Sequence, residues 1–426
     1  MTEQRTNFRW KIAFLIFLCS LVAYMDRVNF SVATPVIMQE FGFTKIDMGF
    51  LQTCFFAGYA LMQVPGGVLA DKLGLRKTGT LAVLWWSVFT ALTAVAKGKV
   101  SFAAIRLLFG VGEGPLFPAL GAATYRWFNN HEKGKASSSI LGGTFFGPVI
   151  GPIITVALLG AFGWHMVFLI FGVIGLILAY VWHKFAVDNP ADSKYANDAE
   201  VAYINQGRSQ EAAKKAIAPW GKLLTNVRFW AIGIQFMVVD YIMYVFLAWL
   251  PMYLTEAHGL SLKSMGYWTT VPWIALTAMV FFAGFISDKL SQSANENRQY
   301  QMRTVTAIAG IVVTGVSLCI AANTPTLGMN IFWMTVALGA LGFSMSASWS
   351  SVISLGGKYT GSVSGWMNLW GNIGGVLAPI VTAFLVEAYG WNQAFVVTAC
   401  FGIIVIICWL IVKPGKVLIP ESSETK

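Results

Sequence analysis

The sequence predicts an all-α membrane protein in which twelve transmembrane helices form two six-helix bundles related as a parallel repeat. Of its 426 residues, 56% are hydrophobic and only 11% are charged, whereas soluble domains average about 25% charged residues. The apolar residues gather in runs of about 20, the length that a helix needs to cross a bilayer. Twelve runs are predicted to be membrane helices: 12–36, 46–70, 78–96, 100–125, 136–161, 164–186, 229–254, 265–287, 304–323, 329–356, 361–388 and 392–412.

The first run is too long for the core of a signal peptide and has no clear small-residue cleavage site, so we expect it to remain as the first membrane helix. An even number of helices puts both termini on one side of the membrane. With the termini in the cytoplasm, 23 of the 29 Lys and Arg residues lie in cytoplasmic segments. Two more lie within helices, and only four lie on the opposite side: Lys45, Lys97, Lys99 and Lys263. This bias predicts cytoplasmic termini, and it accounts for the net charge of +10 without a nucleic-acid partner.

The longest polar segment follows the sixth run and divides the chain. It predicts an N-terminal bundle at 1–187, a cytoplasmic linker at 188–225 with a surface helix near 198–215, and a C-terminal bundle at 226–426. The two bundles share sequence: GGVLADKLG contains Asp71 and AGFISDKLS contains Asp288, while PIITVALLGAFGW (152–164) matches PIVTAFLVEAYGW (379–391) without a gap. Six intervening helices preserve the orientation, so the repeat is parallel, a plan found in transporters that rock two bundles about a central site.

Five ionisable residues fall inside the predicted membrane helices: Asp26, Arg27, Arg106, Glu113 and Asp240. Insertion scales put the cost of each at about 2.5–3.5 kcal/mol, which makes such residues functional candidates by default. They therefore indicate a polar site near the middle of the membrane.

Asp26 and Arg27 are neighbours, so on a helix their side chains point about 100° apart and each needs a partner elsewhere. We expect Asp26 to lie near Arg106 across the bundle, with Arg27 left to face a cavity. There its planar fork can bind a carboxylate. A purely structural ion pair is the alternative for Asp26 and Arg106.

Glu113 lies in GVGEGPLF, where the flanking glycines allow close helix approach. Burial without a fixed cation favours the neutral form of a carboxyl group, so we interpret Glu113 as the group that takes up and releases a proton. A permanently protonated glutamate bonded to a neighbour is the alternative. Asp26 is then a second protonation site or a switch partner of Arg106.

Uncharged polar residues complete the predicted substrate site. Tyr59 and Gln63 share one helix face, Asn368 and Asn372 share another, and Trp349 lies in the polar run SMSASWSS. A polyhydroxylated ligand needs such donors and acceptors, although helix packing is the alternative for the small residues. Asp240 either accepts hydrogen bonds from substrate hydroxyls or pairs across its bundle.

Several motifs resemble known transporters. GGVLADKLGLRK (66–77) resembles the signature cytoplasmic loop of the major facilitator superfamily. YMDRVNFSVATP (24–35), RLLFGVGEGPLFPA (106–119) and RWFNNHEKGKASS (126–138) are similar to the anion:cation symporter family, above all its bacterial sugar-acid branch, which includes D-galactonate transporters. The resemblance implies the major facilitator fold and a monomeric, proton-coupled importer of an organic anion in the bacterial cytoplasmic (inner) membrane. A hexonate, hexuronate or aldarate is the implied substrate.

The resemblance also bears on single residues. It implies proton coupling at Glu113 and Asp26, and gating contacts at Asp71 with its repeat counterpart Asp288. Thr144 occupies a position that contributes a pocket amide in the sugar-acid branch, which changes the expected hydroxyl pattern of the substrate. At Asp240 the family usually has an uncharged residue.

Other classes of function are less well supported. The four histidines lie near loops or helix ends and the five cysteines have no CxxC spacing, so no metal, no cofactor beyond the coupling proton and no enzyme activity are predicted. An exporter of drugs or metabolites with the same fold is the main alternative, and such a cavity is usually apolar with an acidic determinant, whereas Arg27 favours an anion. The internal repeat and the central charges argue against a receptor.

Overall fold

The computed structural model describes residues 4–129, 131–206, 218–293 and 296–419, apart from the side chains of 287–299. All regular secondary structure in these residues is helical. The chain divides into two compact units, Met1–Lys214 and Lys215–Lys426, and each is described by itself.

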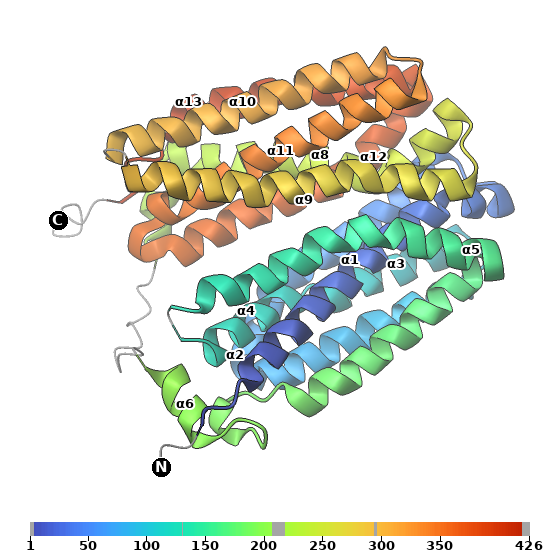
Figure 1. Cartoon of the computed structure of the whole chain (residues 1–426). Helices are drawn as coiled ribbons and strands as arrows, with labels where there is room; N and C mark the ends of the chain where they lie inside the picture. The colour runs from blue at the N-terminus through green and yellow to red at the C-terminus, as the bar shows by residue number, and fades with distance from the viewer. Residues whose placement is uncertain (1–3, 130, 207–217, 294–295, 420–426) are drawn as a thin grey trace. The chain divides into compact units, whose positions relative to one another are not determined.

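In the first unit, helices α1, α2, α3 and α5 run side by side (Figure 1). Contacts between α1 and α5 and between α2 and α3 are the most extensive. Helix α2 begins with a capping box, in which the Thr44 hydroxyl accepts the Asp47 N–H and the Asp47 carboxylate accepts the Thr44 N–H. The elements of this unit are α1 (Phe8–Phe41), α2 (Lys45–Thr93), α3 (Lys99–Glu113), α4 (Leu116–Trp127), α5 (Lys133–Phe185), the 3-10 turn η1 (Pro190–Asp192) and α6 (Asp198–Asn205).

The second unit repeats this arrangement, with α8 packed on α12 and α10 on α11. Helix α8 is buried along most of its length, as expected for a helix surrounded by its own bundle. The elements are α7 (Trp220–Leu224), α8 (Val227–His258), α9 (Leu262–Ser293), α10 (Glu296–Ala322), α11 (Leu327–Gly356), η2 (Gly357–Tyr359), α12 (Thr360–Cys400) and α13 (Gly402–Val412).

Eight helical runs in the described residues are long and apolar enough to cross a membrane, where the sequence predicted twelve. Three helices carry more than one predicted span, because each continues through a glycine with positive φ: Gly74 in α2, Gly163 in α5 and Gly390 in α12. The count of twelve is therefore not confirmed by the spans themselves.

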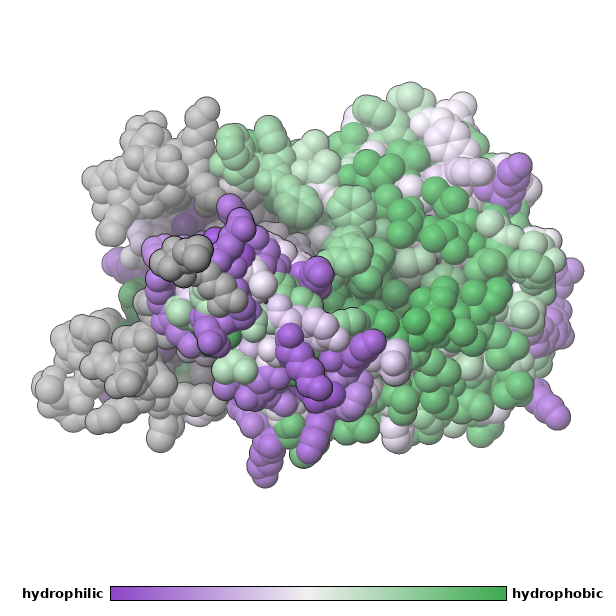
Figure 2. Space-filling model, turned by 60° about the horizontal axis from the view of Figure 1, so that its bottom comes forward, coloured by the Kyte–Doolittle hydropathy of each residue, from purple (hydrophilic) through white to green (hydrophobic). Residues whose placement is uncertain are grey.

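The surface agrees with a membrane environment. In Figure 2 hydrophobic residues cover a broad area to the right of the centre, and hydrophilic residues gather to the left of this area and along the right edge. Many large apolar side chains are exposed on helices, among them Leu61, Ile177, Phe285 and Leu410. A soluble protein rarely exposes so much apolar surface, so the chain is a multi-pass membrane protein.

Matching contacts link the first and last long helical arms within each unit. In the first unit the indole N–H of Trp164 donates to the Glu40 carboxylate over 2.6 Å, and in the second Trp391 donates to Glu256 over 2.8 Å. Trp164 and Trp391 each follow a positive-φ glycine, so the sequence repeat at 152–164 and 379–391 is also a structural repeat.

A second matching contact lies at the start of each first long helix. Arg9 begins α1 and binds Glu200 of α6, whereas Arg228 begins α8 and donates to backbone carbonyls that include those of Val412 and Lys413, at the end of α13. The chain reads TNFR around Arg9 and TNVR around Arg228. An arginine near the start of each unit thus binds the segment that follows that unit's last long helix.

Part of the segment predicted to be a linker is helical. Helix α6 forms at Asp198–Asn205, where the Asn197 side chain caps it by accepting the Glu200 N–H over 3.1 Å. The remainder of the predicted surface helix, from 207, lies outside the described residues.

Candidate functional site

The central feature of the first unit is a buried ion pair between α1 and α3. The Arg27 guanidinium donates to Oε1 of Glu113 through Nε, over 2.8 Å, and through Nη2. Glu113 has 0% exposure and Arg27 has 4%. Two expectations are therefore wrong. Glu113 was expected to lack a fixed cation, and Arg27 was expected to face a cavity, but the two side chains bind each other. Helical spacing could not reveal the pair, because its members lie on different helices.

Aromatic rings surround the arginine of this pair. The Arg27 guanidinium carbon lies 4.4 Å from the ring centre of Tyr24, 4.6 Å from that of Tyr59 and 5.2 Å from that of Phe55. Such contacts hold a cation without consuming its hydrogen-bond donors. The predicted neighbours Tyr59 and Gln63 are joined, because the Gln63 amide donates to the Tyr59 hydroxyl over 2.8 Å. Tyr24 is a site residue that was not predicted from the sequence.

Asp26 was expected to lie near Arg106 across the bundle, with a structural ion pair between them as the alternative. They interact through space, but the structure gives no ion pair between them in the residues it describes. Arg106 instead packs against the rings of Phe30, Phe55 and Phe109, and its Nε makes no hydrogen bond within that part of the chain. The Arg106 guanidinium is thus held by aromatic rings and by the charges of Glu113 and Asp26, which act on it through space.

Asp26 takes its hydrogen bonds from neutral groups. Its Oδ1 accepts from the Asn29 amide over 3.2 Å, and its Oδ2 lies 3.5 Å from the Thr90 hydroxyl on α2. Asn29 in turn accepts a 2.6 Å bond from the Thr155 hydroxyl of α5. Neither Asn29 nor Thr155 was predicted as a site residue, although Asn29 lies three positions after Asp26 on the same helix face.

The other predicted substrate residues are placed as follows. Thr144 on α5 is half-buried and its hydroxyl donates to the Ile140 carbonyl of its own helix. In the second unit, Asp240 on α8 is buried against α12, where a Cβ at Gly371 would lie 2.4 Å from its Oδ2. Trp349 on α11 is exposed and meets the Phe236 ring, and Asn368 on α12 is half-buried. Each of these residues belongs to one unit, and their substrate roles stay predictions.

The loop motif of the first unit contains a contact that the sequence did not indicate. Asp71 is exposed, and the Asp288 side chain lies outside the described residues, so gating at these two positions stays a prediction. Three residues after Asp71, Gly74 has φ +83° and lies against the Asp188 carboxylate, where a Cβ would come within 2.2 Å. Asp188 also accepts from the Arg76 N–H and from Arg126, each over 3.4 Å. The motif therefore binds the segment that follows α5.

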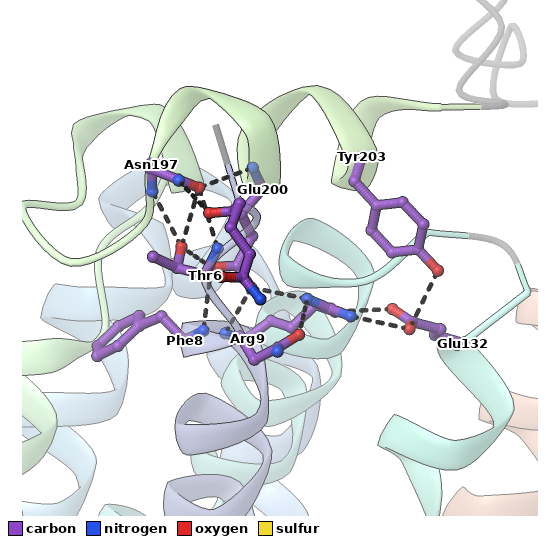
Figure 3. A network of polar contacts seen from close by, with 9 residues as sticks. Thr6, Phe8, Arg9, Glu132, Asn197, Glu200 and Tyr203 are labelled. Carbon is purple, nitrogen blue, oxygen red and sulfur yellow. Dashed lines mark hydrogen bonds and ion pairs between the residues drawn. The ribbon is translucent and has the colours of Figure 1, made fainter. Parts of the chain in front are cut away.

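A second polar network joins α6 to the start of α1 (Figure 3). Glu200 has 0% exposure and accepts the N–H groups of Phe8 and Arg9 at 3.0 and 3.1 Å, the Arg9 guanidinium at 2.8 Å and the Thr6 hydroxyl at 2.6 Å. Asn7, at the cap position of α1, makes no side-chain cap bond. A carboxylate from another element thus takes the place of an N-cap.

The same arginine binds a second carboxylate at the start of α5. Arg9 forms a two-point pair with Glu132, at 2.9 and 3.1 Å, and the Tyr203 hydroxyl donates to Glu132 over 3.2 Å. Burial acts to raise the pKa of Glu132, but its bonds with Arg9 and Tyr203 and the charges of Arg9 and Arg5 outweigh burial and lower it below the usual value.

No group of three or more His, Cys, Asp or Glu residues in the described part of the chain is arranged to hold a metal ion. The first unit buries two arginines, Arg27 and Arg106, and two carboxylates, Asp26 and Glu113, within its predicted membrane helices. Two all-helical units with such a cluster at membrane depth define a polytopic membrane protein that binds or moves charged solutes.

Comparison with known proteins identifies the family of this membrane protein. The chain belongs to the Major Facilitator Superfamily, which it matches over residues 16–379 and again over 303–426. Its structure resembles that of a bacterial homolog of the human lysosomal transporter Spinster, with a TM-score of 0.81 over 97% of this chain and 98% of that one, at 17% sequence identity. The chain is a membrane transporter and not an enzyme, as the motifs predicted.

Curated relatives carry more specific names. A D-galactonate transporter from Escherichia coli O6:H1 is 30% identical over 93% of both chains. A probable galactarate/D-glucarate transporter from Bacillus subtilis is 29% identical over 99% of this chain and 95% of its own. A hexuronate transporter from the same organism is 28% identical over 97% and 96%. These matches confirm the resemblance to sugar-acid transporters.

Proposed function

We propose that the protein is a proton-coupled symporter that imports an organic anion, a sugar acid, by alternating access. One observation carries the proposal: the buried Arg27–Glu113 pair, in which a protein carboxylate occupies the arginine fork that a substrate carboxylate needs. The names of the relatives support a sugar acid as the substrate.

Charge balance explains how substrate transport is coupled to a proton. An uncompensated charge at membrane depth is costly, so the states that reorient easily are those in which this pair sums to zero. The empty protein meets this condition with Glu113 ionised and bound to Arg27. The loaded protein meets it when Glu113 is protonated and the substrate carboxylate binds Arg27.

The two mixed states are disfavoured. Substrate bound with Glu113 still ionised leaves an excess negative charge, and a protonated Glu113 without substrate leaves Arg27 uncompensated. Substrate and proton therefore cross together, one for one. A dicarboxylate adds a second negative charge, which protonation of Asp26 would balance, and the aromatic rings of Tyr24 and Tyr59 keep Arg27 in place during the exchange.

The topology follows from the helices and the charges. Dividing α2 and α5 at Gly74 and Gly163, and the long run Leu327–Val412 at its turn near 357–359 and at Gly390, converts the eight spans into twelve crossings. Each crossing is then near the length that a bilayer requires. The distribution of basic residues favours cytoplasmic termini for a protein of the bacterial inner membrane, and the proposed functional unit is one chain.

The test uses Glu113→Gln, which keeps the shape of the side chain but cannot ionise. Proteoliposomes are assayed with radiolabelled D-galactonate, D-glucarate and D-galacturonate in two modes, exchange against internal substrate and accumulation driven by a pH difference alone. Exchange should persist, because both loaded states remain available. Accumulation should fail, because the empty protein now carries an uncompensated Arg27.

Asp198→Asn is the matched control, since Asp198 is an exposed carboxylate of the same unit, and it should retain both modes. Full pH-driven accumulation by Glu113→Gln would show that Glu113 is not the proton carrier. Absence of transport of all three acids by the unaltered protein would refute the substrate class.

A further inference from the structure

A chain of buried neutral side chains leads from α5 to the second carboxylate of the first unit. Thr155 donates its hydroxyl to Oδ1 of Asn29 over 2.6 Å, and Nδ2 of Asn29 donates to Oδ1 of Asp26 over 3.2 Å. Asn29 and Thr155 each have 0% exposure. Both bonds of the chain therefore form away from water, where their direction has most effect.

An ionised Asp26 fixes the direction of these bonds. An ionised carboxylate is acceptor-only, so it orients the Asn29 amide with its NH₂ group toward Asp26. The amide oxygen then faces Thr155 and requires a donor, which the hydroxyl supplies. A protonated Asp26 needs an acceptor for its own proton, and turning the amide to provide one would direct NH₂ at the Thr155 hydroxyl.

The helix packing makes this chain possible. Residues 143, 147 and 151 of α5 are glycines at four-residue intervals, and Thr155 continues the row. A Cβ at Gly143 would lie 2.4 Å from the Phe17 carbonyl of α1, and one at Gly147 would lie 2.6 Å from the Tyr24 Cβ. The two backbones are thus close enough for the short threonine side chain to reach Asn29.

The second unit shows what the same position does without a carboxylate. Thr382 is the repeat counterpart of Thr155, and its hydroxyl lies 3.5 Å from the Tyr241 hydroxyl of α8. In both units this threonine joins the fifth membrane segment to the first. In the first unit the contact continues through Asn29 to a carboxylate, whereas in the second Thr382 meets the Tyr241 hydroxyl.

Every element around Asp26 contributes a different kind of group. From α3 it experiences the charges of Arg106 and Glu113, from α1 it has Asn29 and the adjacent Arg27, and from α2 it has the Thr90 hydroxyl. In the described residues α5 acts on it only through Asn29, by way of Thr155. Removing the Thr155 hydroxyl therefore changes one bond of the chain and no charge.

We propose that Asn29 and Thr155 are positioning residues that orient a donor toward Asp26, and so set the pH at which this carboxylate exchanges its proton. The inference rests on the proposed function, in which Asp26 is the second protonation site. It adds two residues that touch neither substrate nor proton directly.

The test is a pH titration of Asp26 itself, monitored by difference infrared spectroscopy on the purified, lipid-reconstituted protein. The carboxyl C=O band that Asp26→Asn removes identifies the group. Thr155→Val keeps the side-chain shape but removes the hydroxyl, so the protonation midpoint should move upward by about 0.5–1 pH unit, the equivalent of one hydrogen bond. Thr155→Ser should restore the original midpoint, and Asn29→Ala should shift it in the same direction as Thr155→Val.

Thr34→Val is the matched control, because Thr34 is a fully buried threonine of α1 whose hydroxyl donates to the Phe30 carbonyl of its own helix. It should leave the midpoint unchanged. Equal midpoints in Thr155→Val, Thr34→Val and the unaltered protein would overturn the inference, as would equal shifts in the two variants. If Thr155→Val folds poorly, Thr155→Ala gives the same readout. Because no transport is measured, this result is independent of the Glu113→Gln test.

Discussion

Replacing Glu200 with alanine should release the start of α1 from α6. The carboxylate accepts four hydrogen bonds in a fully buried position: two from backbone N–H groups, one from the Arg9 guanidinium and one from the Thr6 hydroxyl. Alanine removes all four acceptor contacts. It also leaves the first two N–H groups of α1 without a partner, since Asn7 does not cap them.

The contacts that remain limit the free-energy cost of Glu200→Ala. Thr6 keeps a 3.1 Å bond to Asn197, and Arg9 keeps Glu132 and Asn7, so two of the four donors retain partners. Two unsatisfied backbone donors at roughly 1–2 kcal/mol each give about 2–4 kcal/mol, close to the roughly 3–5 kcal/mol that breaking a buried ion pair costs. Glu200→Gln keeps one oxygen acceptor and should cost about half as much.

Hydrogen exchange measured by mass spectrometry on peptides covering residues 4–12 reports the loss of stability at the start of α1. A loss of 2–4 kcal/mol in local opening free energy accelerates exchange of the Phe8 and Arg9 amides by roughly 30- to 700-fold. Asp198→Ala is the control, because Asp198 lies in the same turn of α6 but is exposed, and it should change exchange by less than about threefold.

Two results would refute the reasoning. Unchanged exchange at Phe8 and Arg9 in Glu200→Ala would mean that water or another group caps α1 equally well. Equal acceleration in Asp198→Ala would assign the effect to the net charge of α6 rather than to the four bonds.

Three further outcomes are expected. Arg27→Ala should abolish sugar-acid binding in thermal-shift assays, and Arg27→Lys should weaken it at least about tenfold because lysine lacks the planar fork; near-normal affinity in either would remove Arg27 from the substrate site. A cysteine introduced at position 205 should resist an impermeant maleimide in intact cells and react after lysis, since the linker is predicted to be cytoplasmic; efficient labelling of intact cells would reverse the topology. The pKa of Glu132 is lowered in the folded protein. The ionised carboxylate therefore stabilises the fold fully above the usual glutamate pKa near 4.3, and this stabilisation is lost as the pH falls through the folded pKa. The difference in melting temperature between the unaltered protein and Glu132→Gln should shrink below about pH 4, and a constant difference would contradict this.

The sequence was most informative where chemistry follows from position along the chain. Apolar run lengths and the matched segments at 152–164 and 379–391 predicted two helical bundles. The cost of burying a charge in the membrane was enough to single out Arg27 and Glu113 as functional candidates. These inferences need only local information, since each concerns one segment and its surroundings in membrane or water.

Pairing between helices could not be obtained in this way. Helical spacing gives the face of a side chain but not the depth at which two helices lie beside each other. The sequence therefore placed Asp26 near Arg106 and left Arg27 to face a cavity, whereas Arg27 binds Glu113 in the folded protein. Glu200 was missed for a related reason, because a polar segment interpreted as a linker gives no sign that one of its carboxylates is buried against α1.

One overlooked contact did leave a signal. The glycines at 143, 147 and 151 indicate a face of α5 that approaches another helix closely. The next residue in that row is Thr155, whose side chain is the first able to make a hydrogen bond. Following the row to its end would have predicted a polar contact there, although not that Asn29 receives it.

The contacts that join the first long helix of each unit to its last, Glu40 with Trp164 and Glu256 with Trp391, lie wholly within one unit. A gene for a single unit would therefore encode the contacts that close it, which is the condition for a fold to arise by duplication of a shorter ancestor. The same property makes the protein a candidate for assembly from two separately translated fragments. The break belongs after Asn205, because a first fragment ending before α6 would lack Glu200 and leave the start of its own first helix uncapped.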